Sequence, residues 1–150
     1  MSFKVDFPKE EDCKKIYELN LEAFGSELTI DHAYIKEWYE SNAYQWLIAK
    51  DEEDNLLGYI NISHIKNKTF DDIINGRISE KDVRSEDILK LGQKDKICCY
   101  IQGFAVRNKN TRVAISLLNK VLAYVRFLKE KGICVERVGA INRQGTDTCP

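Results

Sequence analysis

The residues best suited to chemistry lie in a short basic segment in the last third of the chain. Arg107, Lys109 and Arg112 place three positive charges within six positions, just before the strongest helical pattern in the sequence. A helix N-terminus has backbone N–H groups without intrahelical partners and the positive end of the helix dipole, so it attracts phosphate. The first turn lacks the acidic residue that a plain structural helix favours there. The pattern predicts an anion site; a solvated loop before an ordinary helix is the alternative.

Residues with acid–base chemistry are fewer. Tyr100, Gln102, Phe104 and Val106 alternate along one predicted strand, so we expect their side chains to share one face of it. Tyr100 and Gln102 are weak catalytic candidates, because neither type is a ready base at neutral pH. His64, at the end of the preceding predicted strand, has the side chain whose ordinary pKa suits the task best. A lone histidine at a strand end is more often structural than catalytic.

The cysteines show no metal-binding pattern. They number five, without a CxxC pair, and the only histidines are His32 and His64. We therefore predict no metal site. The cysteines expected to act as small buried hydrophobes are Cys13, Cys98, Cys99 and Cys134, whereas Cys149 is expected to be an exposed thiol.

The composition suits a folded protein of one domain over residues 1–150. Hydrophobic residues make up 43% and charged residues 31% of the 150 positions, which excludes a disordered chain. The formal net charge of −1 provides no general attraction to nucleic acid or to a membrane. No apolar run is long enough to span a bilayer, and the first residues do not form a secretory signal. These features predict a cytoplasmic protein.

The hydrophobic periodicity predicts an α/β (α+β) domain with a mixed sheet, in the order β-α-α-β-β-(helical insert)-β-α-β. The predicted elements are a strand at 2–7, a helix at 9–24, a second helix capped by Asp31, strands at 45–50 and 56–64, a charged insert of helical turns at about 65–96, a strand at 97–106, a long helix that ends before Gly132, and a strand at 134–142. The insert is expected either to contribute to the site or to be a solvated excursion without a role.

Two details refine the unit that carries the basic segment. Gly103 inside the strand at 97–106 is typical of a bulge or a close backbone approach. The long helix after it has apolar residues at helical spacing, which we predict to face the sheet. These residues are Ala114, Leu117, Leu118, Val121, Leu122, Val125 and Leu128.

This order of elements, with the loop that follows Val106, resembles the Gcn5-related N-acetyltransferases (GNAT) over residues 2–142. Their signature, Gln/Arg-x-x-Gly-x-Gly/Ala, corresponds here to Thr111-Arg112-Val113-Ala114-Ile115-Ser116. The resemblance implies that backbone amides of this segment hold the pyrophosphate of acyl-CoA. Ala114 and Ser116 stand where glycine is usual, and Thr111 replaces the usual Gln or Arg. Each added Cβ takes up space near the phosphate and is expected to weaken binding.

The resemblance also implies a reaction and further contacts. Phe104, Ala105 and Val106 match the strand end that bonds the pantetheine arm, and Asn142 matches an asparagine near the same arm. Acetyl-CoA would be the co-substrate, and a primary amine would attack its thioester directly in a ternary complex. The acceptor would be a small molecule or a peptide amine, with the insert at about 65–96 flanking it.

The sequence departs from the family at its C-terminal end. The family places a tyrosine acid in a helix after the fifth strand, and the sequence reaches Pro150 before such a helix. We therefore expect the C-terminal helix and strands to be absent, with the strand at 134–142 left as an edge that could pair in a homodimer. The alternative function is a catalytically inactive GNAT-like module that binds CoA or a protein partner.

Overall fold

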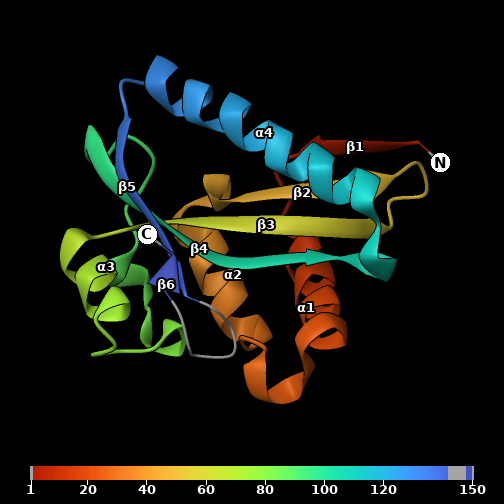
Figure 1. Cartoon of the computed structure of the whole chain (residues 1–150), viewed down its shortest axis with the longest axis horizontal. Helices are drawn as coiled ribbons and strands as arrows, with labels where there is room; N and C mark the ends of the chain where they lie inside the picture. Colours follow the sequence, from red (N-terminus) through yellow and green to blue (C-terminus); the bar gives the residue numbers. More distant parts are fainter. Residues whose placement is uncertain (1, 142–147, 150) are drawn as a thin grey trace.

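The elements of the computed structural model follow the predicted order (Figure 1). The structure describes residues 2–141 and 148–149. The helices are α1 (Asp12–Leu28), α2 (His32–Ser41), α3 (Asn67–Ile74) and α4 (Thr111–Glu130). The strands are β1 (Phe3–Asp6), β2 (Trp46–Asp51), β3 (Leu56–Ile65), β4 (Lys96–Val106), β5 (Cys134–Ile141) and a short β6 (Thr148–Cys149). The predicted fold class is confirmed.

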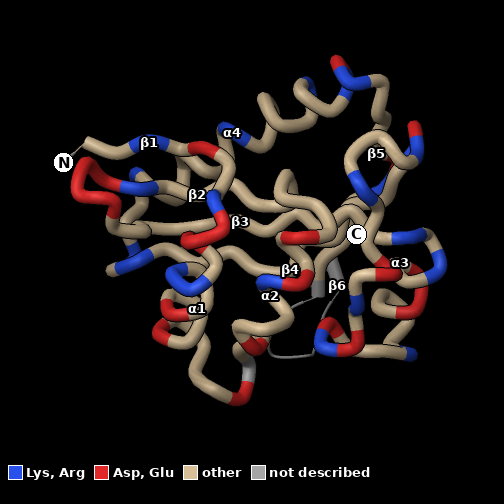
Figure 2. Tube along the Cα trace, turned by 180° about the vertical axis from the view of Figure 1, so that it is seen from behind, with Lys and Arg blue, Asp and Glu red and all other residues tan. Residues whose placement is uncertain are grey.

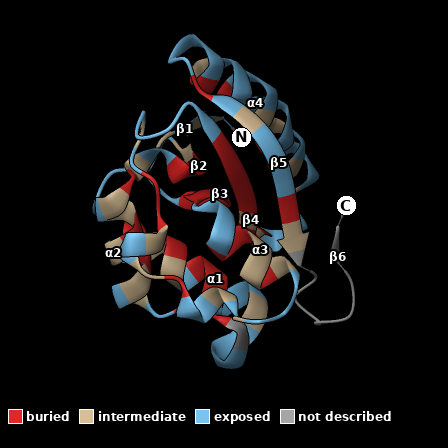
Figure 3. Cartoon of the chain, turned by 90° about the vertical axis from the view of Figure 1, so that its left-hand side faces the viewer, coloured by how far each residue is buried: buried red, intermediate tan, exposed pale blue. Residues whose placement is uncertain are grey.

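The strands form one mixed sheet in the order β1-β2-β3-β4-β5-β6, in which only β4 and β5 are parallel neighbours among the described strands. Helices α1 and α2 cover one face of this sheet and α4 covers the other (Figure 1). Each face therefore has its own hydrophobic core, and the strands between them are buried on both sides. Figure 3 shows this directly, with β4 buried and the outer surface of α4 exposed.

The local signals at the first two helices place their ends close to the prediction. Gly25 adopts a φ of 77°, which interrupts α1, and one further turn follows before Leu28. Asp31 caps α2, because its side chain accepts a hydrogen bond from the Ala33 N–H at 3.1 Å. Glycine tolerates a positive φ without steric cost, so this position suits a break between helical turns.

Strand β4 contains a bulge beside Gly103. Asn61 of β3 is opposite Gly103, and the next β3 residue, Ile62, is opposite Ile101. Gln102 is therefore the extra residue of β4 in this register. An extra residue in one strand reverses the alternation of side chains beyond it, because the side-chain period of a strand is two. The glycine signal at this position is confirmed.

The bulge overturns one expectation, that four β4 side chains share a face. Tyr100 packs in the core beneath α1 and α2, and Gln102 lines a cavity on the same side. Phe104 and Val106 instead pack against the core under α4, while Ala105 points to the α1 and α2 side. The prediction of one shared face is wrong because strict alternation does not survive the extra residue.

Helix α4 lies against the sheet along a different stripe from the one predicted. The buried residues of the helix are Val113, Leu117, Tyr124 and Leu128. Leu118, Leu122 and Val125, which were expected to face the sheet, are 50%, 71% and 41% exposed, and Ile115 is 52% exposed. The apolar positions cover a wider arc than the sheet can contact, so periodicity alone did not choose the contact line.

Gly58 in β3 fixes where α4 touches the sheet. A methyl group at Gly58 would lie 3.0 Å from Cγ1 of Val113 and 3.2 Å from Cδ1 of Leu117. It would also lie 3.1 Å from the carbonyl oxygen of Ala105 on the neighbouring strand. The absence of a side chain at Gly58 therefore lets the first two turns of α4 sit close to β3.

The insert packs onto the sheet through an apolar side. Phe70, Ile73, Val83, Ile88 and Leu89 are all buried. This segment contains α3 and two 3-10 turns, Glu80–Asp82 and Ser85–Asp87. A solvated excursion does not describe it, since its apolar side chains form part of the core.

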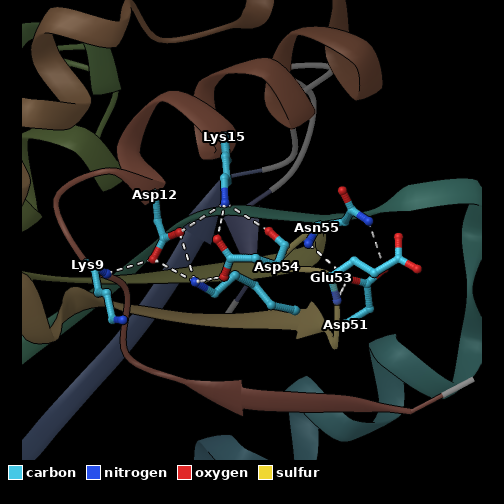
Figure 4. Close-up of polar contacts among 8 residues, drawn as sticks. Lys9, Asp12, Lys15, Asp51, Glu53, Asp54 and Asn55 are labelled. Carbon is cyan, nitrogen blue, oxygen red and sulfur yellow. Dashed lines mark hydrogen bonds and ion pairs between the residues drawn. The ribbon is translucent and has the colours of Figure 1, made fainter.

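The start of α1 is joined to the β2–β3 hairpin by a network of charges (Figure 4). The carboxylate of Asp12 has no exposed surface, accepts from the Lys9 N–H at 2.7 Å and bonds Nζ of Lys50 at 3.1 Å. Asp54 of the hairpin bonds both Lys50 and Lys15 at 2.7 Å. These two lysines hold the pKa of the Asp54 carboxyl at about 2, below its usual value. The network fixes α1 relative to β2 and β3.

The acidic turn of the hairpin stands beside the N-terminal strand at one end of the molecule (Figure 2). At the other end of the sheet, β6 pairs with Ala140 and Ile141 of β5. Cys134, which was predicted to be buried, is exposed because it begins this outer strand. The homodimer through 134–142 stays a prediction. Among the described residues, no helix is long and apolar enough to cross a bilayer.

Replacing Gly58 with alanine should destabilise the protein by about 1–3 kcal/mol, because the methyl group overpacks the contact between α4 and β3. The measurement is urea-induced unfolding. In a double-mutant cycle with Val113→Ala, the double variant should lose less stability than the sum of the two single variants, because Val113 is the side chain that the new methyl group contacts. Strict additivity would show that this contact does not set the position of α4.

Candidate functional site

Among the described residues, the pairing between β4 and β5 extends only part of the way along β4. Its last pair joins Ile101 to Ala140. Beyond this point, residues 103–106 of β4 keep β3 on one side, through pairs such as Tyr59 with Ala105. No described strand pairs with their other side. A half-paired strand presents a row of backbone N–H and C=O groups, which an extended ligand can bind.

The N-terminus of α4 follows this strand end after a single short turn. Asn110 caps the helix, and its side chain accepts from the Val113 N–H at 3.3 Å. The N–H groups of Thr111 and Arg112 form no bond within the part of the chain that the structure describes. Asn108 and Lys109, just before the cap, both have positive φ, 55° and 50°. Backbone strain of this kind accumulates at binding sites, and turns of this kind form anion-binding concavities.

The basic residues of this segment are not equivalent. Arg107 donates from Nε to the Leu56 carbonyl at 3.1 Å and from Nη1 to a Glu22 carboxylate oxygen at 2.6 Å. Its charge is therefore matched by α1. Lys109 and Arg112 are exposed and form no ion pair with a described residue. The guanidinium of Arg112 lies 5.8 Å from the centre of the Phe3 ring. The charge available to an anion comes from Lys109 and Arg112.

The remaining residues of the predicted phosphate segment differ in burial. Val113 is buried and Ile115 is exposed, while Ala114 and Ser116 are half-buried. Their side chains therefore point to both the buried and the exposed side of α4. Only the backbone of the first turns is common to all four residues. Asn142 lies outside the described residues.

A small cavity lies under the β4 bulge, on the face of the sheet that α1 and α2 cover. Gln102 and Gly103 of the bulge line it together with Asn61 of β3. Its volume is about 20 Å³, which holds roughly one water-sized group. The other lining residues are Ile16, Asn20, Ile30, Ile35, Trp38, Trp46 and Tyr59. The bulge thus has the half-paired edge of β4 on one side and this cavity on the other.

The predicted catalytic pair lies beside a carboxylate from the insert. The hydroxyl of Tyr100 donates to Oε1 of Glu80 at 2.6 Å. Gln102 accepts from the Ser63 hydroxyl at 2.9 Å and donates to the Glu80 carbonyl at 3.5 Å. Sequence reasoning missed Glu80, because only the tertiary fold brings it to β4. The capping residues Ser79 and Asp82 around it predict a turn and say nothing of that contact.

His64 lies on the opposite face, under α4, and is 1% exposed. The Asn42 amide donates to Nδ1 at 3.0 Å, so the ring proton is on Nε2 and is directed at the Tyr124 hydroxyl. Tyr124 in turn donates to the Tyr44 carbonyl at 2.8 Å. Burial lowers the pKa of His64 to about 4 and raises that of Tyr124. A neutral imidazole in this position joins α2, β3 and α4, and it does not line the cavity.

Within residues 2–141 and 148–149, no group of three or more His, Cys, Asp or Glu side chains could hold a metal ion.

Comparison with solved structures identifies the architecture. The loading GNATL domain of CurA from Lyngbya majuscula matches with a TM-score of 0.65 at 17% identity, over 95% of this chain and 65% of that one. GphF, a GNAT-like decarboxylase in complex with isobutyryl-CoA, matches with a TM-score of 0.63 at 15% identity, over 92% and 65%. The diaminobutyrate acetyltransferase EctA from Paenibacillus lautus matches with a TM-score of 0.55 at 12% identity, over 94% and 66%.

These matches establish the GNAT fold for this chain and confirm the resemblance at the level of the fold. The chain spans 65% of the length of the CurA and GphF structures and 66% of that of EctA. No protein-family model matches the sequence, and no curated protein matches it.

The buried His64 predicts how stability depends on pH. Above pH 6.5 the imidazole is neutral in both states; as the pH falls toward about 4, the unfolded chain gains a proton that the folded protein excludes. Stability should therefore fall over this window, by up to about 3 kcal/mol from this group. In His64→Gln, the decrease in the free energy of unfolding between neutral pH and pH 4 should be smaller than in the wild type by about 3 kcal/mol. Urea-induced unfolding at several pH values across this range measures the difference. His32→Gln is the matched comparison. An unchanged slope in His64→Gln would contradict the buried neutral ring.

Proposed function

We propose that this protein binds an acyl-CoA and transfers its acyl group, with acetyl as the simplest case, to a primary amine. The observation that carries the proposal is the end of β4–β5 pairing at Ile101 and Ala140, directly before the N-terminus of α4. The half-paired edge at 103–106 suits an extended amide-containing arm. The helix start with Lys109 and Arg112 suits the phosphates that follow such an arm.

Solved neighbours support a CoA-type co-substrate. GphF is described with isobutyryl-CoA, and EctA with both L-2,4-diaminobutyric acid and coenzyme A. Because their fold is the one found here, the same layout of strand edge and helix terminus is expected to hold the co-substrate of this chain. The acceptor of EctA carries an amine, which supports an amine acceptor, either a small molecule or a peptide.

The chemistry requires positioning more than a reactive side chain. A backbone N–H on the edge of β4 would donate to the thioester oxygen and stabilise the negative charge that develops there. The amine nitrogen then attacks the thioester carbon, the C–N bond forms, and the C–S bond breaks with CoA leaving as a thiolate. Glu80, held beside Tyr100 and Gln102, is the carboxylate placed to accept the amine proton. Holding both substrates in line supplies much of the rate.

A second reaction class, decarboxylation of an acyl-CoA, is favoured by one observation. No Asp, Glu, His or Lys among the described residues lines the cavity under the bulge, and GphF is described as a decarboxylase. Loss of CO2 from a 2-carboxyacyl thioester, such as malonyl-CoA, needs no base: the C–C bond to the carboxylate breaks and its electron pair forms a thioester enolate. Hydrogen-bond donors at the edge of β4 would stabilise that enolate before water protonates it.

Calorimetric titration with acetyl-CoA and with CoA tests the binding step. We expect micromolar affinity that weakens from low to physiological ionic strength, because exposed cations contact phosphates. No binding at millimolar ligand would contradict the proposal. Turnover then separates the reactions: acetyl-CoA consumed only with an amine supports transfer, and release of CO2 from malonyl-CoA supports decarboxylation. Binding without either turnover would indicate an inactive CoA-binding module.

The double variant Lys109→Ala, Arg112→Ala should weaken acetyl-CoA binding by about tenfold or more and flatten its salt dependence, because two charge-assisted phosphate contacts are lost. The readout is the same titration. Lys129→Ala, in the last turn of α4, is the matched control, since it removes a charge from the same helix far from its N-terminus. Equal effects of the double variant and the control would show that the phosphates bind elsewhere.

A further inference from the structure

We infer that Asn20 selects the acceptor, by accepting a hydrogen bond from the amine of a slender, unbranched alkylamine whose tip enters the cavity under the β4 bulge. This inference rests on the proposed transfer to an amine and adds the chemical class of its acceptor. It concerns a residue of α1 that the sequence did not single out.

The first observation is a buried acceptor without a donor. Asn20 is 3% exposed, and its Oδ1 has no hydrogen-bond partner among the described residues. A buried carbonyl oxygen that forms no hydrogen bond costs folding free energy, and such groups are rare in native proteins. A ligand in the cavity that donates an N–H to Oδ1 of Asn20 would explain why this oxygen has no donor from the described protein.

The second observation is that the neighbouring amides are already engaged. Asn61 donates to the Gln45 carbonyl at 3.3 Å. The single proton of the Ser63 hydroxyl is shared between Oδ1 of Asn61 at 2.7 Å and Oε1 of Gln102 at 2.9 Å. Among the three described amides that line the cavity, Asn20 is therefore the one whose carbonyl oxygen contacts no donor.

The third observation is the lack of charge. Among the described residues, no ionised side chain lines the cavity, and Trp38, Trp46 and Tyr59 are part of its lining. An ammonium that enters loses its hydration without a carboxylate in the described cavity wall, so the cavity is expected to lower the pKa of a bound amine. The neutral amine is the nucleophilic form, and its N–H still donates to Asn20. The site thus favours the reactive protonation state.

The fourth observation is size and place. A volume of about 20 Å³ admits one water-sized group, such as an NH2, and we expect it to favour an unbranched end over a branched one. Gly103 lines the same cavity and belongs to the half-paired part of β4. An amine bonded to Asn20 therefore lies beside the strand edge proposed to hold the thioester.

Asn20→Leu tests the inference, because leucine has a similar volume and no acceptor. Relative to the wild type, we expect a higher midpoint of thermal unfolding, acetyl-CoA affinity within about twofold, and kcat/KM for n-propylamine lower by about tenfold or more. The rise in stability together with the loss of acceptor use is the signature of a buried group kept for a ligand. Asn119→Leu, at an exposed position of α4, is the matched control.

Two further measurements complete the test. In the wild type, n-propylamine should be used at least about tenfold better than isopropylamine, because the branch does not fit. In Asn20→Asp, the pH at which the rate rises should move upward, because a carboxylate raises the pKa of the bound amine. Calorimetric titration of n-propylamine into the CoA-bound protein gives the same comparison of variants without turnover.

The outcomes separate the inference from the proposed function. A wild type that binds no acetyl-CoA overturns both. If the wild type binds acetyl-CoA, the Asn20→Leu variant decides the role of Asn20. A variant that is less stable and that uses or binds n-propylamine as well as the wild type overturns the role of Asn20 alone. Equal use of n-propylamine and isopropylamine overturns the predicted size limit, and turnover of malonyl-CoA with no effect of any amine overturns the acceptor class.

Discussion

The site depends on one irregularity, the bulge that Gln102 introduces into β4. Before it, β4 has strands on both sides; after it, the pairing with β5 has ended at Ile101 and Ala140 while the pairing with β3 continues. The extra residue also reverses which side chains face each helix layer. A regular strand would bury its backbone groups in two ladders. In the bulged strand, a row of these groups is not paired by any described strand, and this row lies beside a cavity on one face and before the start of α4.

Close packing holds α4 where its N-terminus can serve that edge. Gly58 allows Val113 and Leu117 to approach β3, and the bond between His64 and Tyr124 joins the middle of the helix to the same strand. Both contacts lie on the buried side of α4, so the first-turn N–H groups and the side chains of Lys109 and Arg112 do not take part in them. The rigid attachment of a helix terminus is what makes its dipole useful as a binding site.

The other side of the bulge is assembled from parts distant in the sequence. The insert brings Glu80 to Tyr100, and the charge network of Asp12, Lys50 and Asp54 fixes the beginning of α1 on the hairpin. Two turns further along α1, Asn20 lies over the cavity. A buried carboxylate that loses its partners is costly, so this network strongly restricts the position of α1. The orientation of Asn20 is thus set by interactions that do not touch the cavity.

The sequence by itself determined the order of the elements, the cap at Asp31, the bulge signal at Gly103 and the basic segment before α4, because each depends on residues close together in the chain. Tertiary structure alone decided which arc of α4 faces the sheet, since Leu122 and Leu117 are equally apolar and only Gly58 offers a close contact. Tertiary structure also pairs Arg107 with Glu22 and buries His64 away from the cavity. It brings Glu80 and Asn20 close to β4. Contacts between distant segments follow from packing and from the pairing of charges, and local periodicity contains neither.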